Sequence, residues 1–162
     1  MTGWRISPLP DARLAEAWPL VHLRYPTWTL DTWLCEARTL LADRLSGLSV
    51  AQTASRYIYA VCGFAVDTSD PGRPLLRLPL VANLLWRGGD DPLGRLLANV
   101  EAAGCEYRCH EVRVDSAAIA AAGDGARWQR LGYERDGVAL RKGLLSHPAS
   151  TFASGLEGAA CP

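Results

Sequence analysis

The sequence predicts a mixed α/β (α+β) domain, in which a mostly antiparallel sheet of six or seven strands is flanked by about four helices. Segments with apolar residues at helical spacing alternate with short apolar runs that are typical of strands. Their order is strand, two helices, three strands, helix, strand, helix, strand, which is not the strict alternation of a doubly wound dinucleotide-binding fold. The 162 residues, 49% of them hydrophobic and 21% charged, suffice for one domain with a sizeable core.

The first third of the chain predicts one strand and two helices. Residues 4–9 form a short strand, and a helix capped by Asp11 follows. Pro19 must kink this helix or start its second half, because proline cannot donate the helical hydrogen bond. Thr29 caps a second helix, which Gly47 ends.

Three strands and a helix occupy the middle of the chain. We expect strands over 48–53 and 57–67, joined as a hairpin, and a third over 75–85. The third is the most apolar, so we place it at the centre of the sheet. A helix then runs from Pro92 to Gly104.

The last elements are a strand, a helix and a final strand. The strand covers 107–115, and Ser116 caps an alanine-rich helix that is interrupted at 123–125 and ends before Gly132. Residues 133–144 form a last strand or hairpin arm. We therefore expect one domain over 1–145 and a flexible tail over 146–162, which contains a single formal charge.

A glycine-rich turn between the central strand and the next helix is the strongest local motif. It reads Arg87-Gly88-Gly89-Asp90-Asp91-Pro92. A strand, a glycine-rich turn and a helix start often bind phosphate, because free N–H groups and the helix dipole point at one place. Asp91 before Pro92 is also a self-sufficient helix start, whose carboxylate would bind the N–H of Leu93 or Gly94. Alternatively, the aspartates point outward and the glycines form a phosphate cradle; the sequence leaves both arrangements open.

Two ordered patterns carry a resemblance to a known superfamily over residues 4–144. The first comprises Val81 on the central strand, Arg87-Gly88 in the turn, and Gly94 with Leu97 in the helix. The second comprises Ser116, Trp128, Leu131-Gly132-Tyr133 and the strand residues 138–142. Together they resemble the acyl-CoA loop and the closing signature of the GNAT acetyltransferases. The loop is about two residues longer than is usual in that family, Pro92 stands where a glycine is expected, and Trp128 replaces a frequent tyrosine acid.

The resemblance implies acetyl-CoA or another acyl-CoA as co-substrate and direct transfer to an amine. The implied acyl-CoA-binding residues are Val81, Arg87, Gly88, Gly89, Leu93, Gly94, Arg95 and Trp128. A backbone N–H of the central strand would polarise the thioester carbonyl.

Three residues are candidates for proton transfer. His110 and Glu111 lie on the strand over 107–115, beside the expected entry of the thioester, and either could serve as the base. Adjacent strand residues face opposite sides, so at most one can point into the site. Tyr133 could replace the missing acid, since an indole N–H cannot supply a proton at ordinary pH. Each candidate also has an ordinary interpretation as a surface or core residue.

Aromatic rings crowd the two N-terminal helices. Trp18, His22, Tyr25, Trp28 and Trp33 fall within sixteen residues. In the GNAT family this helix pair commonly forms one side of the acceptor site, which implies a pocket for a small or aromatic amine. The alternative is that the rings form core or an oligomer interface, and a homodimer is compatible with the edge strands of such a fold.

Several classes of partner are not expected. The formal net charge is zero and the basic residues are scattered, so nothing favours nucleic acid or an anionic membrane. No signal peptide or membrane span is apparent, which predicts a cytoplasmic protein. Cys105, Cys109 and His110 lack a second ligand pair at metal-binding spacing, so we expect no metal.

Three functional hypotheses follow. The first is an acyl-CoA-dependent N-acyltransferase, most simply an N-acetyltransferase. The second is a non-catalytic module of the same fold that binds a small ligand or a protein, which the aspartates of the turn and Trp128 favour. The third is another acyl-CoA reaction, such as thioester hydrolysis or decarboxylation.

Overall fold

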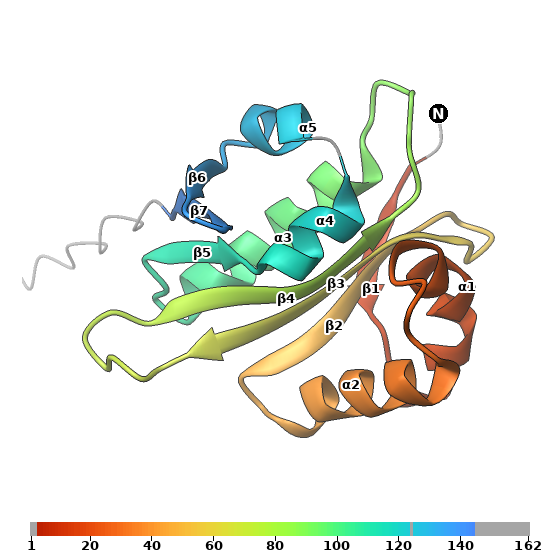
Figure 1. Ribbon diagram of the computed structural model, residues 1–162, viewed down its shortest axis with the longest axis horizontal. Helices are drawn as coiled ribbons and strands as arrows, with labels where there is room; N and C mark the ends of the chain where they lie inside the picture. The colour runs from red at the N-terminus through yellow and green to blue at the C-terminus, as the bar shows by residue number, and fades with distance from the viewer. Residues whose placement is uncertain (1–2, 124, 145–162) are drawn as a thin grey trace, which may run out of the picture.

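Seven strands form one sheet in the computed structural model, which describes residues 3–123 and 125–144 (Figure 1). The tail predicted over 146–162 lies outside these residues. The strands are β1 (Arg5–Pro8), β2 (Ser46–Gln52), β3 (Ile58–Asp67), β4 (Leu75–Asn83), β5 (Glu111–Val114), β6 (Glu134–Asp136) and β7 (Ala139–Gly143). The helices are η1 (Asp11–Arg13), α1 (Leu14–Arg24), α2 (Leu30–Ala42), α3 (Pro92–Glu106), α4 (Ser116–Ala122) and α5 (Gly125–Arg130).

The sheet order is β1-β2-β3-β4-β5-β7-β6. Every adjacent pair is antiparallel except β4 and β5, which are parallel. The predicted mixed α+β class, with its mostly antiparallel sheet, is confirmed. In the described part of the chain no helix combines the length and the apolar character that a bilayer span requires.

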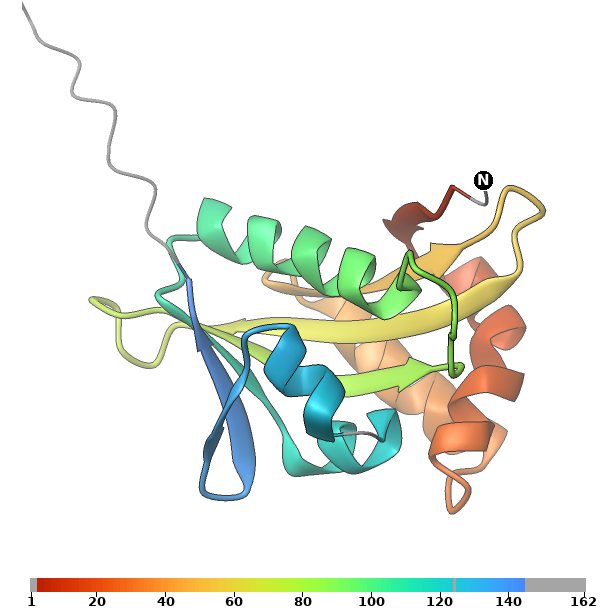
Figure 2. The same cartoon turned by 90° about the horizontal axis from the view of Figure 1, so that it is seen from above.

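The helices cover both faces of the sheet, as Figure 2 shows. α3 packs on one face with Trp128 and Tyr133, and α1 and α2 pack on the other around Trp33. α4 contributes Ala118 and Ala122 to the first hydrophobic cluster and Ala121 to the second. This alanine-rich helix therefore reaches both clusters, and its small side chains permit close contact with the central strand β4.

A β-bulge at Pro79 shifts the alternation of side chains along the central strand β4, so that Leu78 and Leu80 face opposite sides of the sheet. Gly63 of β3 pairs with Leu80, and Ala65 pairs with Arg77, so two residues of β4 oppose one residue of β3. Leu78 faces the α3 cluster before the bulge, whereas Leu80 faces the α1–α2 cluster after it. Proline within a central strand is expected at such a bulge, because it cannot donate a ladder hydrogen bond.

β4 and β5 separate immediately after the bulge. Their last paired residues are Leu78 and Val114, and the N–H of Asp115 donates to the Leu78 carbonyl at 3.2 Å. β5 then gives way to α4, while β4 continues through residues 79–83. We call this separation the fork. Within residues 3–123 and 125–144, it leaves one backbone edge of β4 without a neighbouring strand.

Several predicted boundaries differ from the structure. The helix predicted to end at Gly104 continues to Glu106, and the strand predicted over 107–115 is limited to Glu111–Val114. Asp11 does not cap a helix; its carboxylate accepts a hydrogen bond from Arg38 at 2.7 Å.

The predicted end of the second helix was also wrong, whereas the final element keeps the bounds expected for it. α2 ends at Ala42, because Asp43 is extended and its carboxylate accepts the N–H of Leu45 at 2.9 Å, so Gly47 lies inside β2. The final element is a hairpin, in which Gly137 turns the chain at a φ of 61°.

Candidate functional site

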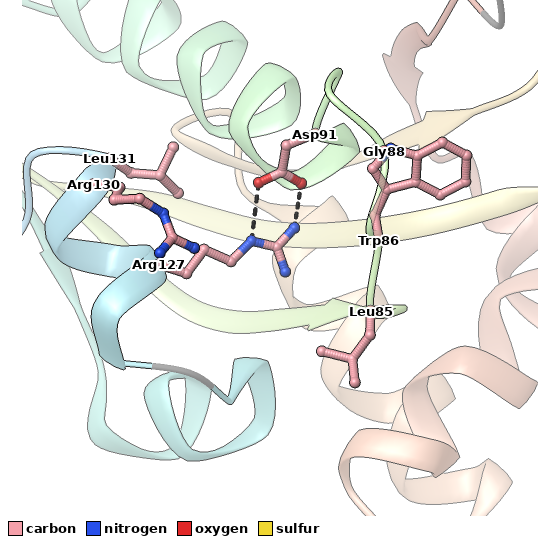
Figure 3. A pocket seen from close by; sticks show the side chains of 7 residues that line it. All are labelled: Leu85, Trp86, Gly88, Asp91, Arg127, Arg130 and Leu131. Carbon is pink, nitrogen blue, oxygen red and sulfur yellow. Dashed lines mark hydrogen bonds and ion pairs between the residues drawn. The ribbon is translucent and has the colours of Figure 1, made fainter.

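A pocket of about 260 Å³ lies between the segment that connects β4 to α3 and the helix α5. Figure 3 shows its lining residues, which are Leu85, Trp86, Gly88, Asp91, Arg127, Arg130 and Leu131. The glycine-rich turn forms one wall, and two arginines of α5 contribute to the other. The pocket thus combines the predicted phosphate motif with positive charge supplied from a distant part of the chain.

The Asp91 carboxylate occupies the N-terminus of α3. It accepts the N–H of Leu93 at 3.0 Å, and Arg127 donates to it from both Nε and Nη2 (Figure 3). The side chain of Arg127 is 10% exposed and that of Asp91 is 31% exposed, so the pair is substantially desolvated. An N–H at a helix start and a bidentate arginine are the donors that bind a phosphate, and here a carboxylate of the protein uses them.

The other predicted cradle residues are arranged around this cap. The N–H of Arg95 donates to the Asp91 carbonyl at 3.0 Å, and its side chain forms an exposed ion pair with Asp90. Gly94 lies under Leu131, because a Cβ on Gly94 would stand 3.2 Å from Leu131 Cδ2. The alternative in which the aspartates point outward therefore fails for Asp91. Arg87, Gly88 and Gly89 are exposed.

An aromatic cluster holds the glycine-rich turn. The ring centroids of Trp86 and Trp4 are 5.0 Å apart, and Tyr59 of β3 is 4.9 Å from Trp4 and 5.7 Å from Trp86. Trp4 Nε1 also donates to the carbonyl of Asp90 at 2.8 Å. Gly88 is required beside Trp86, since a Cβ there would lie 2.5 Å from Trp86 Nε1. The turn is therefore fixed from the side of β1 and β3.

The fork is closed by the C-terminal end of α1. The N–H of Leu84 donates to the carbonyl of Tyr59 on β3. Because backbone groups alternate in direction along a strand, those of Val81 and Asn83 point away from β3. The Tyr25 hydroxyl accepts the Val81 N–H and donates to the Val81 carbonyl, each at 3.2 Å. Arg24 Nε donates to the Asn83 carbonyl at 2.6 Å.

His110 and Glu111 lie at the closed end of the β4–β5 pair. Glu111 is paired with Leu75 at the beginning of β4, and His110 Nδ1 contacts the Pro74 carbonyl at 2.8 Å. The sequence argument placed both residues beside the fork, and that placement was wrong, because β5 is shorter than expected and runs from these residues toward the fork.

Tyr133 and Trp128 are core residues, each 1% exposed, with ring centroids 5.1 Å apart. The Tyr133 hydroxyl donates to Glu101 at 2.7 Å, and Lys142 also binds Glu101. Burial, reinforced by the negative charge of Glu101, raises the pKa of Tyr133. Neither residue lines the pocket beside the turn.

The aromatic residues of the N-terminal helices make three separate sets of contacts. Trp33 is fully buried and its Nε1 donates to the Leu14 carbonyl at 2.9 Å. Trp18 and His22 pack together on α1, whereas Trp28 packs on Tyr25 with ring centroids 4.6 Å apart. Of the five predicted acceptor-site residues, Tyr25 bonds directly to the fork at Val81, and Trp28 packs on Tyr25.

Arg127 and Arg24 contribute to the site without having been predicted. Arg127 is 36 residues from Asp91 in the sequence, and Arg24 is 59 residues from Asn83. Arg127 immediately precedes Trp128 in the predicted closing signature, and Arg24 immediately precedes Tyr25. The sequence signal that could have revealed Arg127 and Arg24 was therefore their place next to two residues already predicted for the site.

Comparison with solved structures identifies the fold as that of the GNAT acetyltransferases. The aminoglycoside 6'-N-acetyltransferase AAC(6')-Ih from Acinetobacter baumannii matches with a TM-score of 0.66 and 22% identity, over 82% of this chain and 92% of that chain. Aminoglycoside 6'-acetyltransferase type Ii matches with a TM-score of 0.70 and 12% identity, over 89% of this chain and 99% of that chain.

A third similar structure contains coenzyme A. AAC(6')-Iy in complex with CoA matches with a TM-score of 0.66 and 17% identity, over 83% of this chain and 90% of that chain. No protein-family model and no curated protein matches the sequence. At these identities the similarity establishes the fold, and the fold resemblance drawn from the sequence is thereby confirmed.

Proposed function

We propose that this protein is an acyl-CoA-dependent N-acyltransferase that transfers an acyl group, most simply acetyl, directly to a small amine. The observation that carries the proposal is the fork. After the bulge at Pro79, Val81 presents an N–H and a carbonyl on an edge of β4 that no strand covers. An extended molecule that contains amide and carbonyl groups can pair with such an edge.

The proposed reaction uses the Val81 N–H as a hydrogen-bond donor to the thioester carbonyl. The amine nitrogen forms a bond to the carbonyl carbon, and the carbon–sulfur bond breaks with its electron pair going to sulfur. The departing CoA thiolate takes up the proton that the amine loses, so the products are an amide and the CoA thiol. A fixed backbone donor would stabilise the negative charge that develops on the carbonyl oxygen. The pocket at the turn, with Arg127 and Arg130, is the proposed location of the CoA phosphates.

The acceptor is proposed to approach from the α1 side of the fork, past Trp28 and Tyr25. Asp115 begins α4 at the point where the strands separate, and its carboxylate accepts a hydrogen bond from Arg77 at 2.7 Å. Burial raises the pKa of Tyr25 to about 12, and the charge of Asp115 adds to this effect. A carboxylate at this position would attract an ammonium group.

Direct binding tests the proposal. Isothermal titration of the purified protein with acetyl-CoA should give a Kd of about 1 mM or tighter, within the range of ordinary enzyme substrates. S-acetylpantetheine, which lacks the nucleotide and its phosphates, should bind more weakly, because it can engage only the fork. A folded protein that binds neither compound would contradict the proposal.

The second candidate function is a non-catalytic module of the same fold. The specific observation in its favour is the Asp91 cap, which uses the α3 N–H and Arg127 that a phosphate would need. Asp91→Asn separates the two candidates, because an asparagine keeps the capping oxygen but removes the negative charge. An acyltransferase should bind acetyl-CoA severalfold more tightly after this substitution, as repulsion falls. Asp90→Asn, on the exposed neighbour, is the control, and a module should bind acetyl-CoA in neither form.

A further inference from the structure

We propose that the Tyr25 hydroxyl competes with acyl-CoA for the backbone groups of Val81 on the open edge of β4. A thioester can then pair with Val81 only after this hydroxyl has withdrawn. This inference rests on the proposed function, since it takes acyl-CoA as the molecule that needs this edge. Tyr25 is thus a residue that sets affinity for the acyl donor, not a catalytic residue.

The first support is that one hydroxyl uses both polar backbone groups of Val81. It accepts from the N–H and donates to the carbonyl, each at 3.2 Å, and the Tyr25 side chain is 7% exposed. Buried backbone groups must have partners, so the edge of β4 needs either this hydroxyl or a ligand. A thioester carbonyl and an amide carbonyl of the pantetheine arm are both acceptors that would compete for the same N–H.

The second support is that the neighbouring residue makes the same kind of contact. Arg24 binds the carbonyl of Asn83, which lies on the same edge two residues beyond Val81. Two consecutive residues at the end of α1 therefore bind the two successive carbonyls that face the fork. This spacing follows the edge of a strand, and it places the end of α1 where an extended ligand would lie.

The third support is the position of Tyr25 in its own element. It follows the last residue of α1, with a φ of −123° and a ψ of 70°, and Pro26 comes next. Proline prevents the helix from continuing, so the α1–α2 connection begins here. Tyr25 packs on Trp28 within the same connection. Withdrawal of the hydroxyl would therefore move the end of a helix and a short connection.

Tyr25→Phe tests the inference, because phenylalanine keeps the ring and its contact with Trp28 but removes both hydrogen bonds to Val81. Isothermal titration should show acetyl-CoA binding about tenfold more tightly than to the wild-type protein, as expected when competing neutral hydrogen bonds are removed. Amide hydrogen exchange should be faster at Val81 in the unliganded variant. Tyr57→Phe, which removes a hydroxyl from a side chain that is 72% exposed, is the matched control and should change neither measurement.

The outcomes separate this inference from the proposed function. If the wild-type protein binds acetyl-CoA and Tyr25→Phe binds it equally or more weakly, or if exchange at Val81 is unchanged, Tyr25 is not a competitor and the acyltransferase proposal stands. If the wild-type protein, Tyr25→Phe and Asp91→Asn all fail to bind acetyl-CoA, both proposals are overturned.

Discussion

Asp91 combines two roles that are usually separate, since one carboxylate caps α3 and also neutralises Arg127 of α5. Its effect on stability should therefore exceed that of an ordinary helix cap. The capping bond is local in the sequence, whereas the ion pair joins two helices that approach each other only in the folded protein. Removal of Asp91 would leave a guanidinium that is 10% exposed without its carboxylate partner.

Asp91→Ala should lower the free energy of unfolding by about 2–4 kcal/mol, the sum of a lost cap and an uncompensated buried charge. Urea denaturation followed by circular dichroism measures this change. Asp90→Ala is the matched control, because the Asp90–Arg95 pair is exposed and should contribute about 0.5 kcal/mol or less. Equal effects of the two substitutions would show that neither the cap nor the Arg127 pair adds to stability.

The difference between these contacts also explains which residues the sequence could reveal. Asp91 before Pro92 is a local pattern, and the predicted cap on the Leu93 N–H is present. The contacts of Arg127 with Asp91 and of Tyr25 with Val81 span 36 and 56 residues. No periodicity encodes such contacts, because they depend on how the helices pack on the sheet.

At the scale of elements, aromatic rings hold the glycine-rich turn. Trp4 precedes β1, Tyr59 lies on β3 and Trp86 lies just before the turn, and together the three rings fix one side of the pocket. Gly88 and Gly89 are adjacent and look alike in the sequence, yet their surroundings differ. Only Gly88 lies against the Trp86 indole, while nothing is within 4 Å of a Cβ built on Gly89.

Gly88→Ala should displace the Trp86 ring and lower the free energy of unfolding by about 1–3 kcal/mol, as overpacking does elsewhere. Tryptophan emission should shift at the same time, because the Trp4–Trp86 contact would be lost. Gly89→Ala has open space for its methyl group and serves as the control. A larger effect from Gly89→Ala than from Gly88→Ala would contradict the placement of Trp86.

Strands and helices were predictable to different degrees. The strand over 75–85 was expected from its apolar residues, and β4 occupies most of that range. Pro79 was the one sequence signal for the bulge, since a proline inside a central strand needs such an irregularity. The strand over 107–115 was overestimated because residues 107–110 turn the chain after the end of α3, before β5 begins.

For the whole molecule, a buried thiol and a buried tyrosine hydroxyl predict how the free energy of unfolding depends on pH. Burial raises the pKa of the Cys62 thiol from 9.0 to about 12 and that of Tyr25 from 10.0 to about 12. Between about pH 9 and 12 the unfolded chain releases these protons while the folded protein keeps them. The folded state then binds more protons, so the free energy of unfolding falls as the pH rises.

Urea denaturation between pH 8 and 11 should therefore show a steady loss of stability. Cys62→Ala should reduce the slope, by at most about 1.4 kcal/mol per pH unit, because one thiol no longer titrates. Cys35→Ala is the control, since that thiol is exposed. An unchanged slope for Cys62→Ala would show that the buried thiol does not contribute to the alkaline loss.

The fold class was more predictable than the site. Hydrophobic periodicity and the order of elements sufficed for a mixed sheet with helices on both faces, because each element buries its own apolar face. The relative positions of elements, which bring Tyr25 to Val81 and leave His110 far from the fork, follow from the strand order and the bulge. Those are properties of the assembled sheet.

The single parallel pair in the sheet has a consequence for the order of folding. The strands from β1 to β4 pair antiparallel with their neighbours in sequence, as do β6 and β7, and β5 joins β7. The two halves meet through four residue pairs between β4 and β5, which form only after the chain of α3 has crossed between them. Paired residues lie 36 positions apart in this seam and between 6 and 19 apart in β2–β3, and distant pairings carry a larger loop-closure entropy, so the seam should form after β2–β3. Pulse-labelled hydrogen exchange during refolding should then protect the β2–β3 amides before those of β5.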